Sequence, residues 1–177
     1  AVTNMRAMFV AATSLTSVTL PKTGAVTDMR YMFSSASSLT SVTLTDTSAV
    51  TNMSNMFLDA SSLISVSLPK TGAVTNMNQM FSGASSLTTV TLPDTSAVTD
   101  MSDMFNSVSL STTSYDALLN SWNALTLQNG LVFSGGNSSS SPASADAKAN
   151  IRSTYGWNIT DGNIDIVSPT VTLTGPS

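Results

Sequence analysis

The stretch that decides the fold reads AVTNMSNMFLDASSLISVSLPKTG, residues 49–72, and it is one copy of a 24-residue block that recurs without insertion. The five copies begin at Ala1, Ala25, Ala49, Ala73 and Ala97. Val returns at the second position of every copy, Met at the fifth and Phe at the ninth. A fixed period of about 20 to 50 residues is typical of stacked repeats, because one such unit cannot bury its own apolar face. We therefore expect a solenoid that offers a long surface and no deep pocket.

Each block has two parts. Residues 15–20 alternate apolar side chains with Ser and Thr and lead into a turn at 21–24, which predicts a short strand. Residues 29–36 space their apolar side chains by three and four, which predicts one or two helical turns. A strand and a helical turn in every block is the pattern of leucine-rich repeats. The predicted fold is an α/β leucine-rich repeat solenoid, with a parallel sheet on one face and short helical turns on the other.

The repeat ends after Phe105, and the following residues predict an α/β cap. Ser114 is the predicted N-cap of a helix to Leu125, followed by a strand near 131–133 and a helix over 142–155 that stops at Gly156. The predicted organisation is repeats over 1–110, a capping region over 111–167 and a linker over 168–177. No equivalent cover precedes Ala1, so we expect a cap or further repeats upstream.

The repeat pattern L-x-x-V-x-L-x-x-T-x-x-V-T-[ND]-M-x-x-M-F resembles the BspA-type leucine-rich repeat surface proteins, which are also known among mycoplasma lipoproteins. The resemblance extends to two cap motifs, YDALLNSW at 115–122 and YGWNITDG at 155–162. Residues 168–177, SPTVTLTGPS, resemble the start of a bacterial immunoglobulin-like domain. The resemblance implies an extracellular adhesion module on a bacterial cell surface, and it names no ligand.

Composition excludes several classes of function. The net charge is −4 with only six Lys and Arg residues, too few for the basic patch that nucleic-acid binding requires. No apolar run reaches the roughly 18 residues needed to span a bilayer. The chain has no His and no Cys, so Ser-His-Asp and Cys-His catalysis and imidazole or thiolate metal sites cannot be built. We expect no enzyme activity.

The residues left to meet a ligand lie on the outward face of the predicted strands and at its edge. The outward positions carry hydroxyl side chains, which are Ser17, Thr19, Ser41, Thr43, Ser65, Ser67, Thr89 and Thr91. A charge column that alternates in sign flanks them, formed by Lys22, Asp46, Lys70 and Asp94. Three interpretations stay open for the hydroxyl grid: a solvated sheet surface, a ligand-facing sheet, or an ice-binding face.

Three other patterns have structural and functional interpretations. Five Met-x-x-Met pairs could bind Cu(I) through thioethers, but their helical spacing beside Phe favours core packing. Asn or Asp stands at the fourth position of every block, which favours hydrogen bonds within turns over a row of calcium ligands. Asp161, Asn163 and Asp165 alternate near the end of the chain and suggest a calcium site, the one cofactor that the sequence offers.

The sequence thus predicts a monomeric adhesion module within a longer surface protein. Its partner would be a peptide, a protein or another cell-surface ligand, bound on the Ser/Thr face. A structural spacer in a surface stalk is the main alternative, and an ice-binding domain is the third.

Overall fold

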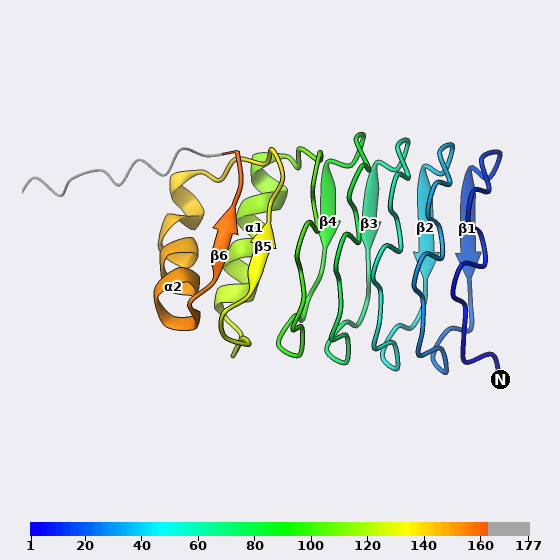
Figure 1. Cartoon of the computed structure of the whole chain (residues 1–177), viewed down its shortest axis with the longest axis horizontal. Coiled ribbons are helices and arrows are strands. Elements are labelled where there is room, and N and C mark those ends of the chain that lie inside the picture. The colour runs from blue at the N-terminus through cyan, green and yellow to red at the C-terminus, as the bar shows by residue number, and fades with distance from the viewer. Residues whose placement is uncertain (163–177) are drawn as a thin grey trace, which may run out of the picture.

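The computed structural model describes residues 1–162 as a stack of coils, one coil for each block, with two helices covering one end (Figure 1). Each of the first four coils contains one short strand: β1 Ser17–Leu20, β2 Ser41–Leu44, β3 Ser65–Ser67 and β4 Thr89–Thr91. The covered end holds α1 Thr112–Asn123, β5 Val132–Ser134, the short 3-10 helix η1 Pro142–Ser144, α2 Ala145–Tyr155 and β6 Asn158–Thr160. The prediction of repeated parallel strands in a mixed α/β chain is confirmed.

The strands pair in exact repeat register but do not form the single sheet that we expected. Strand β1 pairs with β2 so that Ser17 faces Ser41, and β3 pairs with β4 so that Ser65 faces Thr89, while β5 pairs with β6. Strands β2 and β3 are neighbours without a ladder between them, so the described chain has three two-stranded parallel sheets. The hydrogen bond from the Ile64 amide to the Thr40 carbonyl is 3.4 Å, whereas the equivalent bond one coil earlier is 2.9 Å.

The prediction of helical turns opposite the strands is wrong. Residues 29–36 and their equivalents form consecutive tight turns, and no helix occurs within residues 1–111. Two residues in this segment of every coil have positive φ, for example Tyr31 at 56° and Ser35 at 59°. A left-handed residue every fourth position interrupts any helix, yet it preserves the spacing of three and four that the apolar side chains share with a helix.

The hydrogen bonds of this turn segment explain why turns replace the helix. From Met29 to Ser35, alternate amides donate to carbonyls of the next coil over 2.7–3.2 Å. The amides of Met32 and Ser34 donate to carbonyls three residues back along the same coil, and that of Arg30 donates to the Asp28 side chain. A helix would use all of these amides internally, so it could not join one coil to the next. A row of single bridges from Asn4 to Asp100 adds a second parallel ladder on this side.

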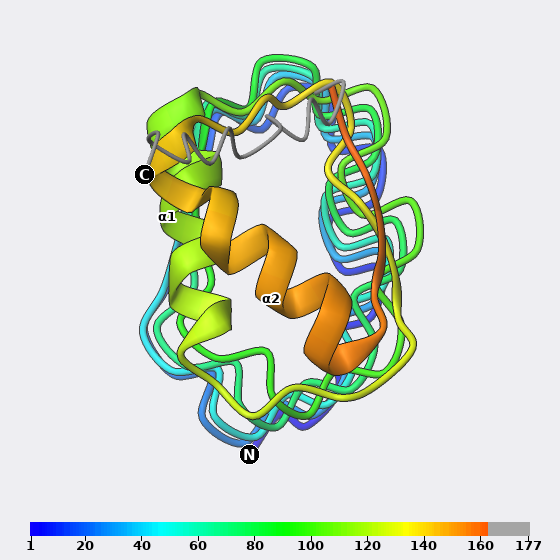
Figure 2. The same cartoon turned by 90° about the vertical axis from the view of Figure 1, so that its left-hand side faces the viewer.

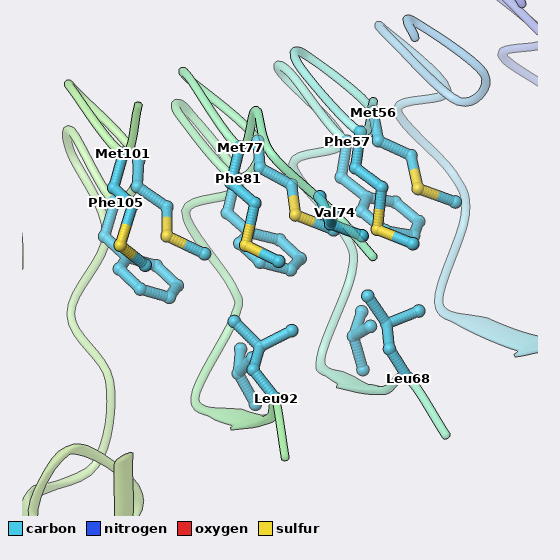
Figure 3. Close-up of a cluster of buried hydrophobic side chains, with 14 of the residues drawn as sticks. Met56, Phe57, Leu68, Val74, Met77, Phe81, Leu92, Met101 and Phe105 are labelled. Atoms are coloured by element: carbon cyan, nitrogen blue, oxygen red, sulfur yellow. The ribbon is translucent and has the colours of Figure 1, made fainter. Parts of the chain in front are cut away.

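The core lies between the strands and the turn segment and runs the length of the stack. Figure 3 shows Phe57, Phe81 and Phe105 in the same orientation in successive coils, with Leu68 and Leu92 facing them from the strand side. These side chains are at most 1% exposed. Every coil contributes the same set of apolar residues, so each coil buries the face of its neighbour, as the repeat predicts.

The stack is nearly straight. Successive Phe rings from Phe9 to Phe105 lie 5.3–5.5 Å apart, and their planes differ by only 2–8°. Viewed along the stack, the coils superpose on one another (Figure 2). The strand side is therefore close to flat across its four rungs.

Helix α1 covers the strand side of the last coil. Its N-cap is Ser111, whose side chain accepts a hydrogen bond from the Ser114 amide, so the prediction of Ser114 as N-cap is wrong. Ser114 instead binds the backbone of β4, because its hydroxyl oxygen accepts from the Val90 amide at 3.1 Å. The helix thereby continues the hydrogen bonding of the strand that the fifth block lacks.

Strand β5 continues the turn side, and α2 lies across the end of the stack (Figure 2). Phe133 packs edge-on against Phe105 at 6.1 Å and ends the column of stacked rings. The carboxylate of Asp116 accepts hydrogen bonds from the Ser141 amide and from the hydroxyls of Ser141 and Ser144, which fixes the start of the second helix. Helix α2 ends at Gly156 with φ of 67°, as predicted.

Candidate ligand-binding surface

The predicted hydroxyl face is present and free. All eight of its residues are exposed, and the Val between each pair faces the core. Within residues 1–162, none of the eight hydroxyls hydrogen-bonds to another protein group. Because the paired strands are in register, equivalent hydroxyls repeat at about 4.8 Å across a pair and about 7 Å along a strand. The face can therefore donate and accept hydrogen bonds at regular intervals.

Other hydroxyl columns form hydrogen bonds between coils, and sequence reasoning missed them. Thr23, Thr47 and Thr71 are fully buried, and each hydroxyl bonds twice to one residue of the next coil. It donates to the backbone carbonyl of that residue and accepts from its backbone amide, as Thr23 does with Asp46. A further column, which runs from Thr27 to Thr99, donates to carbonyls of the preceding coil over 3.1–3.2 Å. Their recurrence within the turn at 21–24 and shortly after it was the available signal. The strand hydroxyls differ because they have no such partner.

The alternating charge column lies at the edge of the hydroxyl face, as predicted. The Lys70 ammonium lies 3.6 Å from the Asp46 carboxylate of the preceding coil. Both side chains are well exposed, so solvent screens this pair and it contributes little to stability. Hydrogen bonds from Ser48 hold the pKa of Asp46 below its usual value, and Ser96 does the same for Asp94. Both carboxylates therefore stay ionised at the rim.

Two residues after each member of the charge column, Gly and Ser alternate as Gly24, Ser48, Gly72 and Ser96, and shape explains this alternation. A Cβ atom on Gly24 would lie 2.9 Å from the Asp46 carboxylate, and one on Gly72 would lie 2.7 Å from that of Asp94. Each Asp thus covers a Gly of the preceding coil, and these two contacts join the same coils whose strands pair. The alternation of Lys with Asp and of Gly with Ser makes two successive blocks, 48 residues, the repeating unit of the sequence, and the same pair of coils is joined in the structure.

The column of Asn and Asp at the fourth position has the structural role that we expected. Each side chain accepts a hydrogen bond from the amide two residues later, over 2.8–3.0 Å, and so closes a small turn. Asp28 also binds the Arg30 guanidinium at 2.6 Å, and this contact lowers the pKa of Asp28. The methionines of the second to fifth copies are fully buried in the core, which leaves no thioether site there for copper.

The proposed calcium site is wrong for Asp161, and its other two members, Asn163 and Asp165, lie outside the described residues. The Asp161 carboxylate is 2% exposed and lies 2.8 Å from the Lys148 ammonium. The Tyr115 hydroxyl donates to the same carboxylate at 2.8 Å. A buried carboxylate that already has a cation and a phenol as partners joins α1, α2 and the end of β6, and it is not available to a metal. Residues 1–162 contain no cluster of three His, Cys, Asp or Glu side chains.

A hollow of about 550 Å³ opens beside the first coil and includes two rim residues, Lys22 and Asp46. Its other walls come mainly from Val2, Met5 and the turn at 21–25. The hollow gathers no set of catalytic groups and is separate from the strand hydroxyls.

Sequence reasoning also missed Ile64. This residue directly precedes β3 and stands where the other copies have Thr16, Thr40 and Thr88. Its side chain is 54% exposed beside the hydroxyl face. The break in an otherwise uniform Thr column was the signal that could have identified it.

Comparison with known proteins gives one family. The model described as "Mycoplasma protein of unknown function, DUF285" matches residues 1–90 and, in a second overlapping match, residues 64–141. This chain belongs to the DUF285 family. No curated protein and no solved structure matches the chain. In the part of the DUF285 chain that the structure describes, no helix has the length and apolar character to cross a bilayer.

Proposed function

We propose that this DUF285 chain is a leucine-rich repeat module of a BspA-type bacterial surface protein, and that it binds a peptide or protein ligand on its strand face. The observation that carries the proposal is the set of eight exposed hydroxyls that have no protein partner within residues 1–162. In a chain with 9% charged residues, hydroxyls are the main means of polar recognition. Adhesion outside the cell and a monomeric state within a longer chain belong to the same proposal.

The chemistry of the face favours a peptide or protein over a carbohydrate. No aromatic residue lies in β1 to β4, so the face lacks the flat apolar platform on which sugar rings stack. Regularly spaced hydroxyls match the donors and acceptors of an extended backbone. The rim adds one cation or one anion per coil at the edge of this surface.

The test is adhesion of beads coated with the purified chain to intact bacteria and to cultured epithelial cells under flow. Replacing Thr19, Thr43 and Thr91 with Lys should abolish the adhesion of coated beads, because the long charged side chains cover the hydroxyls. Placing Lys instead at Thr13, Ser85 and Asn106, exposed positions outside the strands, controls for added charge and should leave adhesion unchanged.

Equal adhesion by both triple variants would remove the strand face as the binding surface. The structural spacer would be favoured by two results together. Beads coated with the native chain would adhere to no surface, and the chain fused into a stalk would keep the stalk at a fixed length.

A second candidate function is ice binding, and the straightness of the stack favours it. A flat grid of hydroxyls about 4.8 Å by 7 Å apart can match an ice lattice, and the Phe column shows little rotation from coil to coil. Thermal hysteresis of the purified chain tests this candidate directly. Four of the eight hydroxyls belong to Ser, so Ser-to-Thr replacements should raise any hysteresis that exists.

A further inference from the structure

We infer that Ile64 and the seam between β2 and β3 form the central contact of the strand face, and that they bind an extended peptide segment through one apolar side chain and one backbone N–H. This inference rests on the proposed function and narrows it to a position and a ligand class. It comes from the step between β2 and β3, where an aliphatic residue replaces the Thr of the other copies.

The first observation is a missing hydrogen bond. Thr40 and Thr88 occupy the position equivalent to Ile64 in the neighbouring coils. The Thr40 hydroxyl donates to the Thr16 carbonyl of the preceding coil at 3.0 Å, and the Thr88 hydroxyl donates to the Ile64 carbonyl at 3.4 Å. Ile64 has no hydroxyl, so within residues 1–162 the Thr40 carbonyl accepts just one hydrogen bond, the long one of 3.4 Å from the Ile64 amide. The Thr40 carbonyl therefore keeps more capacity to accept a hydrogen bond than its equivalents.

The second observation is that the Ile64 side chain is exposed and does not pack against the core. Ile64 is 54% exposed, although Thr at this position would be more soluble and would complete the hydrogen bond. The sheet is also divided at this step, between β2 and β3. Ile64 therefore weakens the stack locally and leaves an aliphatic side chain in solvent, so the fold itself does not account for this residue.

The third observation concerns what surrounds Ile64. Ser65 and Ser67 follow it on β3, and Ser41 and Thr43 lie on β2 across the seam, all exposed and without a charge among them. An aliphatic side chain, an acceptor carbonyl and several hydroxyls together match a peptide segment with one apolar side chain and uncharged neighbours. The same arrangement is less suited to ice, because Ile64 places an exposed aliphatic side chain directly before the hydroxyls of β3.

The test selects random 12-residue peptides displayed on phage against the native chain and measures binding of the selected synthetic peptides to variants by biolayer interferometry. Ile64→Thr should weaken binding by about tenfold, since an apolar contact is lost and the Thr40 carbonyl gains a new intramolecular donor. The same variant should raise the melting temperature, because the hydroxyl column becomes continuous. Loss of binding then cannot be attributed to unfolding.

Thr88→Ile makes the opposite change one coil later and is the matched control. It should leave binding to the selected peptides within about twofold of the native value. Unchanged binding by Ile64→Thr, together with loss of binding in the Thr19, Thr43 and Thr91 triple-Lys variant, would overturn the role of Ile64 and retain the strand face. Selected peptides that bind the triple-Lys variant as well as the native chain would overturn the proposed function itself. A rise in thermal hysteresis in Ile64→Thr would favour ice binding and overturn the peptide site.

Discussion

The strand side and the turn side of each coil use the same kinds of residue in opposite ways. On the turn side, Asn, Asp and Thr side chains close turns or bind the neighbouring coil, and alternate backbone amides join the coils directly. On the strand side, the backbone makes the bonds between coils, and the eight outward hydroxyls of β1 to β4 have no protein partner within residues 1–162. Polar composition alone does not distinguish a structural surface from a binding surface. The difference lies in whether each polar group already has a partner.

The largest expected effect is on the core that both sides share. Phe57→Ala should lower the free energy of unfolding by about 3–5 kcal/mol, because the side chain is fully buried between two other rings. Chemical denaturation followed by circular dichroism measures the change. Loss of less than about 1 kcal/mol would contradict the packed column.

Removing a buried hydroxyl from the turn that follows the strand should lower the free energy of unfolding by less than the loss of Phe57, but by a measurable amount. Thr47→Val leaves the amide and carbonyl of Lys70 without their partner and should cost about 1–3 kcal/mol. Thr95 is the matched control, since it has the same burial, yet its hydroxyl has no hydrogen-bond partner among the described residues. Thr95→Val should be neutral or slightly stabilising in the same denaturation assay, and equal costs for the two variants would refute the bonding argument.

The Asx turns of the turn side predict a smaller loss. Asn52→Ala removes the acceptor for the Ser54 amide at 2.9 Å and should cost about 1 kcal/mol. Asn52→Asp keeps the acceptor and should retain most of the stability. Differential scanning calorimetry of both variants checks this ranking, and it fails if Asn52→Asp destabilises as much as Asn52→Ala.

Lowering the pH below the ordinary pKa of Asp should destabilise the fold. Burial raises the pKa of Asp116, but hydrogen bonds from Ser141 and Ser144 outweigh burial and lower it below 3.8, and the pKa values of Asp28, Asp46 and Asp94 are lowered too. A carboxyl with a lowered folded-state pKa contributes stability above its ordinary value of 3.8 and loses that contribution as the pH falls through the folded value. Unfolding midpoints should therefore be level near neutral pH and fall below about pH 4. In Asp116→Asn the fall should be shallower.

The smallest effect on stability is expected on the strand face. Thr43→Val replaces an exposed hydroxyl that has no partner in residues 1–162 and should change the free energy of unfolding by less than about 0.5 kcal/mol. Its thermal midpoint should match the native value, while bead adhesion falls. A substantial loss of stability would show that these hydroxyls are structural and that the two sides do not differ as we describe.

Sequence reasoning was most successful where the spacing of apolar side chains along the chain reports which of them are buried. It identified the strands of the repeats and β5, the core columns, the outward hydroxyls and the stop of the second helix at Gly156, but not β6. It was wrong about the turn segment, because a spacing of three and four reports which side chains face inward and not where the backbone amides point. It was also wrong about Asp161, because the partners Lys148 and Tyr115 are distant in sequence and meet only in the folded cap.

The sequence by itself determined the period, the composition of the core and the set of hydroxyls that face away from it, since these follow from apolar spacing and strand alternation. Only the tertiary structure decided which polar groups are consumed between coils, how the Asp residues fit over Gly, and where the sheet divides at Ile64. The physical reason is that a hydrogen bond between coils depends on backbone direction and on the neighbour it meets. The sequence of a single repeat specifies neither the direction of its backbone groups nor the neighbour that they meet.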